Sequence, residues 1–261
     1  MTPENLEGSK TLLRKLFTSA LCLFTFSFCF PVFAEEPRTS DAARGNPAAA
    51  VVQLLAIGAG SGDQNKECAA TGFLVNEDGY ILTNAHVVED ARRCLAGSSG
   101  AKIVAKFAAP SARSATAVSC DVMAMDELHD LAFLRTERTL SPDAARNFAV
   151  LDARDVAVGT AVAVTGHSAF AWQPITQKGT VVRRILLSLS DTSAEKSAVM
   201  ILDVPLQRGA SGSPVYLESG AVVGVITRRN PSRPAETVAV PIGFAIELLN
   251  RNRVGWHPGV K

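Results

Sequence analysis

The chain has 261 residues, of which 47% are hydrophobic and 20% charged, and its formal net charge is +1 at pH 7. This much apolar sequence can form the core of one large domain or of two small ones. Because charges of both signs are interspersed, the composition gives no indication of a nucleic-acid-binding surface or of a polybasic membrane patch.

Residues 1–34 have the layout of a secretory signal. Basic residues precede the uncharged apolar run 16–34, LFTSALCLFTFSFCFPVFA, and small residues stand before a cleavage site after Ala34. We therefore predict cleavage there and export to the periplasm or to the outside of the cell. The alternative is an uncleaved membrane anchor, because a run of this length can just span a bilayer.

The rest of the chain reads as a linker followed by a β-rich domain. Residues 35–50 mix Pro, Gly, Ala and charged side chains without apolar periodicity, which predicts a flexible linker. From Val51 onward, short apolar or alternating runs separated by turn residues predict an antiparallel all-β protein. The polar stretch 137–148 divides these runs into two halves, at about 51–137 and 150–242.

Two stretches have helical periodicity instead of strand periodicity. They are VVEDARRC, directly after His86, and GFAIELLNRNR, near the C-terminal end. We place the folded domain at residues 51–252 and a C-terminal tail at 253–261.

Three segments carry side chains that could act together. TGFLVNEDGYILTNAHVV places His86 after a strand–turn–strand unit, DELHDLAFLR places Asp130 at the head of a strand, and RGASGSPVY places Ser211 in a glycine-framed loop. Each segment alone has an ordinary structural explanation as a strand end or a loop. In an exported β protein with two halves, the order histidine, aspartate, serine indicates a catalytic triad.

These segments resemble those of the trypsin-like serine proteases, and among them most of all the bacterial high-temperature-requirement (HtrA/Deg) peptidases. The resemblance includes DGYILTNAHVV, DLAFL, VVGVIT and VAVPI, and GASGSP stands where the family has Gly-Asn-Ser-Gly-Gly-Pro; it runs from about residue 51 to 250. It implies an all-β fold of two six-stranded antiparallel barrels, with the active site in the cleft between them. We expect the C-terminal helical stretch to follow the second barrel.

The chemistry of the side chains agrees with the roles that the resemblance implies. A serine hydroxyl needs a neighbouring base to accept its proton, and we expect His86 to be that base and Asp130 to orient and stabilise its imidazolium. Ser211 is the predicted nucleophile, because the backbone N–H groups of Gly209 and Ser211 can form an oxyanion hole beside it. Ser213 stands where the family has glycine, directly before Pro214, and we expect it to be a packing residue of the following strand.

We expect the remaining histidines and the cysteines to have structural positions and no part in catalysis. We expect His129, His167 and His257 to lie at the surface. No Cys-x-x-Cys pair or Cys/His cluster occurs after residue 34, so we predict neither a zinc site nor a cofactor. Many trypsin-like proteases have a disulfide that flanks the histidine, and the resemblance therefore implies a Cys68–Cys94 bond with Cys120 free.

The resemblance also locates the primary substrate pocket. It implies pocket walls around Leu206 and along Ile226, Thr227 and Arg228, and none of these side chains is acidic. Since binding a Lys or Arg side chain in a pocket requires a buried carboxylate, we expect a small or medium apolar residue before the cleaved bond. An acidic preference is the alternative if Arg228 or Arg229 turns inward.

We therefore expect a serine endopeptidase that hydrolyses exported or unfolded polypeptides through an acyl-enzyme. Ala210 and Ser213 depart from the family's loop, so the alternative is a catalytically silent binding or chaperone-like protein with the protease fold. We expect no nucleic-acid partner, membrane contact only if the N-terminal segment stays uncleaved, and leave the oligomeric state open. About 50 residues follow Ser211 in this sequence, fewer than a PDZ domain needs, so we expect no PDZ domain here.

Overall fold

The computed structural model describes residues 46–58, 68–107, 116–168, 171–190, 194–230 and 232–259. All of these residues belong to one compact unit of the chain, Ser40–Lys261. The predicted signal segment and the first part of the predicted linker lie outside the described residues. In the ranges given above, no helix combines the length and the apolar composition that crossing a bilayer requires.

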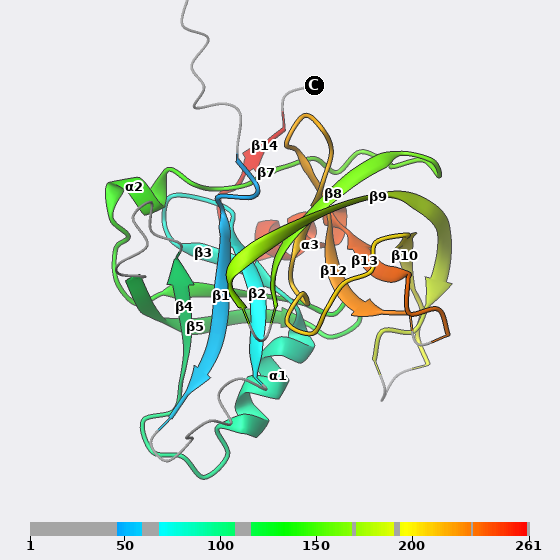
Figure 1. Cartoon of the computed structure of the whole chain (residues 1–261). Helices are drawn as coiled ribbons and strands as arrows, with labels where there is room; N and C mark the ends of the chain where they lie inside the picture. The colour runs from blue at the N-terminus through cyan, green and yellow to red at the C-terminus, as the bar shows by residue number, and fades with distance from the viewer. Residues whose placement is uncertain are drawn as a thin grey trace, which may run out of the picture. The chain divides into compact units, whose positions relative to one another are not determined.

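The first half of the described unit is a closed antiparallel barrel, in the strand order β1-β2-β3-β6-β5-β4 (Figure 1). Its strands are β1 (Val51–Ile57), β2 (Ala69–Leu74), β3 (Tyr80–Thr83), β4 (Lys102–Phe107), β5 (Thr116–Asp126) and β6 (Leu131–Thr136). Alternate residues of β1, namely Val52, Leu54 and Ala56, enter one core cluster, as the period of two along a strand requires. Helix α1 (Ala85–Cys94) follows β3 and packs on this cluster through its buried face.

The second half forms another closed set of six antiparallel strands. They are β8 (Ala161–Ser168), β9 (Ala171–Leu187), β10 (Ser197–Leu202), β11 (Pro214–Tyr216), β12 (Val222–Arg229) and β13 (Thr237–Pro241). Their order is β11-β8-β9-β10-β13-β12, and the β11–β12 pairing closes the ring. The predicted pair of six-stranded barrels is therefore confirmed. Two short strands, β7 (Val150–Leu151) and β14 (His257–Pro258), extend the β12 edge in parallel.

A separate core cluster joins the two barrels. Phe73, Leu82 and Phe133 are aligned across β2, β3 and β6, and they are buried together with Val225, Val240, Ile246 and Leu249 from β12, β13 and α3 (Ile242–Arg251). Burying one such side chain stabilises a fold by roughly 1.5–3 kcal/mol. The shared cluster therefore fixes the position of one barrel against the other. It also fixes the positions of the side chains that face each other across the contact between the barrels.

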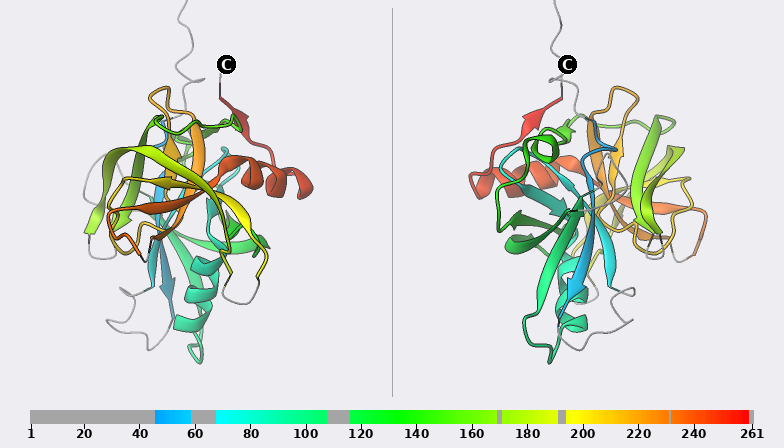
Figure 2. Two further views of the ribbon diagram at one scale, coloured as in Figure 1. Left: turned by 90° about the vertical axis from the view of Figure 1, so that its right-hand side faces the viewer. Right: turned by 60° about the vertical axis from the view of Figure 1, so that its left-hand side comes forward.

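The predicted C-terminal helix is confirmed as α3. Figure 2 shows α1 and α3 well apart, with α1 beside the first barrel and α3 beside the second. The connection between the barrels contains one short helix, α2 (Pro142–Ala145), whose Ser141 hydroxyl caps it by accepting the Ala144 N–H.

One boundary differs from the prediction. Residues 46–50, assigned from the sequence to the flexible linker, form a turn in which Asn46 accepts the backbone N–H groups of Ala49 and Ala50. Pro47 and Ala50 are buried, and Ala50 belongs to the cluster shared by the barrels. Their small apolar side chains fill the core ahead of β1, so the folded domain begins before Val51.

Candidate active site

The ends of two neighbouring strands bring His86 and Asp130 together. Strands β3 and β6 are antiparallel, with Thr83 paired to Ala132, so the residues that follow β3 meet the residue that precedes β6. The backbone N–H of His86 donates to Asp130 Oδ1 at 2.9 Å, and His86 Nδ1 lies 2.8 Å from Asp130 Oδ2. With Nδ1 donating to the carboxylate, Nε2 is the nitrogen that can accept a proton.

Asp130 is held in an uncommon backbone conformation. Its φ is +52°, in the left-handed region, which Asp tolerates better than most residues. The residue is 5% exposed, its carboxylate also accepts a hydrogen bond from the Thr227 hydroxyl, and its backbone carbonyl accepts the Asn84 amide at 2.9 Å. The carboxylate is thus satisfied by the imidazole, a backbone N–H and a hydroxyl, which fixes its orientation toward His86.

The serine loop lies between β10 and β11 and is fastened to the first barrel. Gly209 and Gly212 have φ values of +95° and +85°, which glycine adopts at little cost. A Cβ at Gly212 would lie 1.9 Å from the Thr71 carbonyl oxygen, so the close approach itself requires glycine. Thr71 of β2 donates its backbone N–H to the Ser211 carbonyl at 2.9 Å and its hydroxyl to the Gly209 carbonyl at 2.7 Å.

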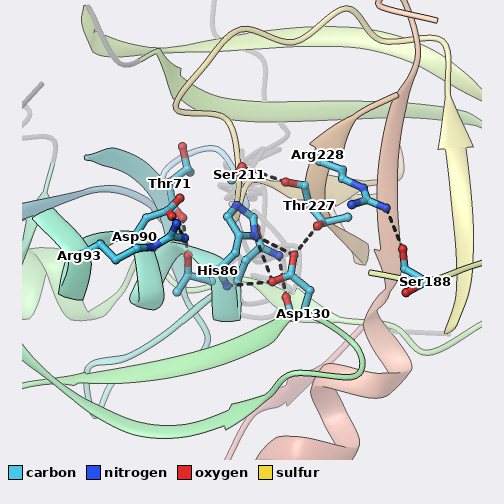
Figure 3. Close-up of polar contacts among 11 residues, drawn as sticks. Thr71, His86, Asp90, Arg93, Asp130, Ser188, Ser211, Thr227 and Arg228 are labelled. Atoms are coloured by element: carbon cyan, nitrogen blue, oxygen red, sulfur yellow. Dashed lines mark hydrogen bonds and ion pairs between the residues drawn. The ribbon is translucent and has the colours of Figure 1, made fainter. Parts of the chain in front are cut away.

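The Ser211 side chain faces the cleft but is turned from the histidine. Its hydroxyl donates to the Thr227 carbonyl at 2.9 Å, and Figure 3 shows the His86 ring between Ser211 and Asp130. Within the described residues, the histidine–aspartate contact is formed and a serine–histidine hydrogen bond is not. Rotation about one side-chain bond redirects a serine hydroxyl, and catalytic hydrogen bonds often tighten only when substrate binds.

The backbone donors expected of an oxyanion hole are available. In the part of the chain that the structure describes, no acceptor takes the N–H groups of Gly209 and Ser211. The carbonyls of both residues are held by Thr71, so the loop is anchored through its carbonyls while these two N–H groups stay free. Sequence reasoning missed Thr71, because nothing in its local pattern indicates a partner 138 positions along the chain.

The environment of His86 favours its protonated form. Burial opposes the charge, but the hydrogen bond and the negative charge of Asp130, with a smaller contribution from Asp90, outweigh it and raise the pKa of His86 above its ordinary 6.5. The positive charge of Arg228 acts in the opposite direction. The His86 side chain is 36% exposed, so it is accessible from the cleft.

A cleft of about 510 Å³ opens beside these residues. Residues 206–211 form one wall and residues 226–230 another, and His86 lines it as well. All four predicted pocket residues line the cleft, but they play different parts: Ile226 is 1% exposed, the Thr227 hydroxyl is turned to Asp130, and Arg228 donates to the Ser188 carbonyl at 2.8 Å. Leu206 is half-buried in the wall. Sequence reasoning missed Arg208, which also lines the cleft.

Ser213 lies beneath the loop, away from the cleft. It is fully buried, its hydroxyl has no partner within the described residues, and a Cβ at Gly166 would lie 1.9 Å from Ser213 Oγ. The residue thus packs against the close-lying backbone of β8, as the sequence analysis expected.

The prediction that three histidines lie at the surface was wrong for His167 and His129. His167 is 2% exposed, and its backbone N–H donates to the Thr71 hydroxyl oxygen where the two barrels meet. His129 is largely buried: its ring pairs with Asp126 at 2.9 Å and stacks on Phe244 at 3.9 Å. His257 is half-exposed and contacts Glu77 at 2.7 Å.

Two cysteines meet beside the cleft. Cys68 and Cys94 are joined in the structure, with Cα atoms 6.5 Å apart and a separation of 26 positions in sequence. Cys120 is free and buried, and burial raises the pKa of its thiol to about 12. That Cys68 and Cys94 form a disulfide bond in solution stays a prediction.

Comparison with known proteins identifies the family whose sequence pattern this chain matches. A family model described as a trypsin-like peptidase domain matches residues 70–225. A probable periplasmic serine endoprotease, DegP-like, from Halomonas elongata is 26% identical over 201 residues, which cover 75% of this chain and 37% of that protein. The magnetosome formation protease MamE from Magnetospirillum gryphiswaldense is 29% identical over 201 residues, covering 74% and 23%.

Solved structures show the same fold. The active form of the Rv3671c protease from M. tuberculosis superposes with a TM-score of 0.61 at 20% identity, covering 82% of this chain and 85% of that one. The chain spans little more than a third of the length of the Halomonas relative and less of the Magnetospirillum one. These likenesses concern the β-barrel unit that carries His86, Asp130 and Ser211.

Proposed function

Because the chain belongs to the trypsin-like peptidase domain family, we propose that it is a serine endopeptidase that hydrolyses polypeptides through an acyl-enzyme. The observation that carries the proposal is the arrangement at the cleft. His86 Nδ1 lies 2.8 Å from a buried Asp130, and Ser211 faces the same cleft from a loop with two positive-φ glycines.

The first half of the reaction uses all three side chains. The Ser211 hydroxyl turns from the Thr227 carbonyl to His86 Nε2 and attacks the substrate carbonyl, while the imidazole takes its proton. Asp130 stabilises the resulting imidazolium, as its effect on the pKa of His86 already indicates. The imidazolium then gives the proton to the leaving amine, and an ester between Ser211 and the acyl group remains.

Water completes the reaction through the same groups. His86 takes a proton from water as the water attacks the ester, and it returns the proton to Ser211 Oγ when the acid leaves. In both halves the negative oxygen would accept the free N–H groups of Gly209 and Ser211. One such donor contributes about 2.7–4 kcal/mol to transition-state stabilisation.

We further propose that the protein works after export. The uncharged apolar run 16–34 with basic residues before it supports a cleaved signal, and the Halomonas relative is named periplasmic. An oxidising compartment would also allow the Cys68–Cys94 bond to form. Polypeptides in that compartment are the proposed substrates.

A second candidate is a silent binding protein with the protease fold. It is favoured by one observation, the Ser211 hydroxyl bound to the Thr227 carbonyl and not to His86. A fluorophosphonate probe separates the two: the endopeptidase is labelled at Ser211, and Ser211→Ala is not labelled. Absence of labelling on folded wild-type protein, checked by circular dichroism, would favour the binding protein.

A further inference from the structure

The cleft beside Ser211 has a basic lining. Arg208, Arg228 and Arg229 line it, from the serine loop and from the end of β12. Among the described residues that line it, the acidic one is Asp90, and this carboxylate is already paired with Arg93. The cleft therefore presents positive charge that the described residues around it do not balance.

Two of these arginines are available to a ligand. Arg208 and Arg229 are exposed, and neither has an ion-pair partner among the described residues. Elsewhere on the second barrel, Arg183 and Arg184 each pair with a carboxylate. In contrast to these two arginines, Arg208 and Arg229 lie at the cleft without a carboxylate partner among the described residues, where a bound polypeptide would lie.

Arg228 differs from the other two because it is partly buried. Its Nη2 donates to the Ser188 carbonyl at 2.8 Å, and its Nε is buried without a partner in the described part of the chain. Figure 3 shows it on the strand beside Thr227, turned toward Ser188. A guanidinium that has lost water without gaining a carboxylate is destabilised, and an acidic group entering the cleft would supply the missing partner.

Building on the proposed endopeptidase, we propose that the cleft selects polypeptides with a Glu or Asp side chain within a few residues of the cleaved bond. Arg208 and Arg229 bind the carboxylate, since guanidinium groups form paired, charge-assisted hydrogen bonds with it. Arg228, in the wall of the cleft, increases the positive electrostatic potential that attracts the carboxylate. Leu206, also in the wall, remains free to contact an apolar side chain at a neighbouring substrate position.

The test is a matched peptide series in which one Glu is placed at each position around the cleaved bond and compared with Gln. We expect a kcat/KM about tenfold higher for Glu at one or more positions, and a ratio that falls as the salt concentration rises. Arg208→Gln and Arg229→Gln should each reduce the ratio. Arg228→Gln serves as a third variant. If Arg228→Gln fails to fold, Arg208→Gln or Arg229→Gln still tests the proposal.

Arg146→Gln is the charge-matched control, because Arg146 is exposed at the end of α2 and does not line the cleft. It should leave the Glu/Gln ratio unchanged. A ratio of one or less at every position would overturn the proposal, and so would a ratio that none of the cleft variants reduces.

Binding to Ser211→Ala separates this proposal from the proposed function. Fluorescence anisotropy with the same peptides should give a lower Kd for the Glu peptide than for the Gln peptide, although the variant cannot form an acyl-enzyme. If the wild type is not labelled by the fluorophosphonate but this difference persists, acidic selection stands and the endopeptidase does not. If labelling succeeds and neither binding nor cleavage prefers Glu, the acidic selection alone is wrong.

Discussion

The Thr71 hydroxyl of the first barrel donates a 2.7 Å hydrogen bond to the Gly209 carbonyl of the second. The Thr71 hydroxyl oxygen also accepts the His167 backbone N–H at 2.9 Å, and the Thr71 backbone N–H donates to the Ser211 carbonyl. One fully buried residue thus fastens the proposed oxyanion loop at two carbonyls. Its function in catalysis would be positional, since it would orient the loop whose N–H groups are proposed to bind the oxyanion.

We predict that Thr71→Val lowers kcat by about tenfold to a hundredfold while KM changes little. Valine has a similar shape but leaves the Gly209 carbonyl without its donor, so the loop loses part of its alignment, and removing one oxyanion donor outright costs about 10²–10³ in kcat. Steady-state kinetics on a peptide substrate measure the effect. Thr71→Ser keeps the hydroxyl and should restore most of kcat. A folded valine variant with wild-type kcat would contradict the role of the hydroxyl.

The two serines of the loop should respond differently to alanine. Ser211→Ala should remove nearly all hydrolysis and leave the free energy of unfolding almost unchanged. Ser213→Ala should keep activity, because its fully buried hydroxyl has no partner among the described residues and its loss removes a desolvated polar group. Kinetics and urea denaturation of both variants provide the comparison, and an inactive Ser213→Ala with an active Ser211→Ala would reverse the assignment.

The positions of the proposed triad were predictable because local patterns carry them. Strand alternation and glycine spacing locate the ends of β3 and β6 and the serine loop, and the order of the segments relates them. The burial of His129 was not predictable in this way. His129 and Asp130 lie in the turn 127–130, and Asp130 has a positive φ, so the His129 ring contacts Asp126 and Phe244 instead of solvent.

The contacts of Thr71 and Thr227 also exceeded what the sequence could predict. Both reach residues of the opposite barrel, at separations of 138 and 97 positions for their hydroxyl contacts. Such contacts depend on how two closed sheets pack on the shared core, and no local periodicity encodes that packing. The same applies to Arg208, whose place in the cleft follows from the fastening of its loop.

The pH dependence should follow the state of His86. A general base must be neutral, so kcat/KM should rise with pH through the pKa of His86, with a midpoint above 6.5 because Asp130 raises that pKa against the effect of burial. Asp90→Asn removes a smaller favourable charge and should move the midpoint downward. Asp130→Asn should lower kcat by about 10⁴, because the imidazole loses its orientation and its counter-charge. A pH profile without a rising limb near neutrality would exclude His86 as the base.

Reduction of the Cys68–Cys94 bond should destabilise the first barrel. The bond would tie the chain before β2 to the last residue of α1, the helix that carries His86, across 26 positions. Constraining a loop of this length stabilises a fold by about 3 kcal/mol in the chain-entropy model. We therefore expect dithiothreitol to lower the free energy of unfolding of the wild type, and the double variant Cys68→Ala, Cys94→Ala to be insensitive to it.

Cys120→Ala supplies the control for that prediction. Burial raises the pKa of the Cys120 thiol to about 12, so its thiolate, the form that exchanges with disulfides, is scarce at neutral pH. This variant should keep the full response to dithiothreitol. Peptide mapping without reduction should recover Cys68 linked to Cys94, and recovery of Cys94 linked to Cys120 would refute the pairing. The two outcomes also differ in structure, because Cys120 lies within β5 and is buried in the core of the first barrel, whereas Cys94 is the last residue of α1.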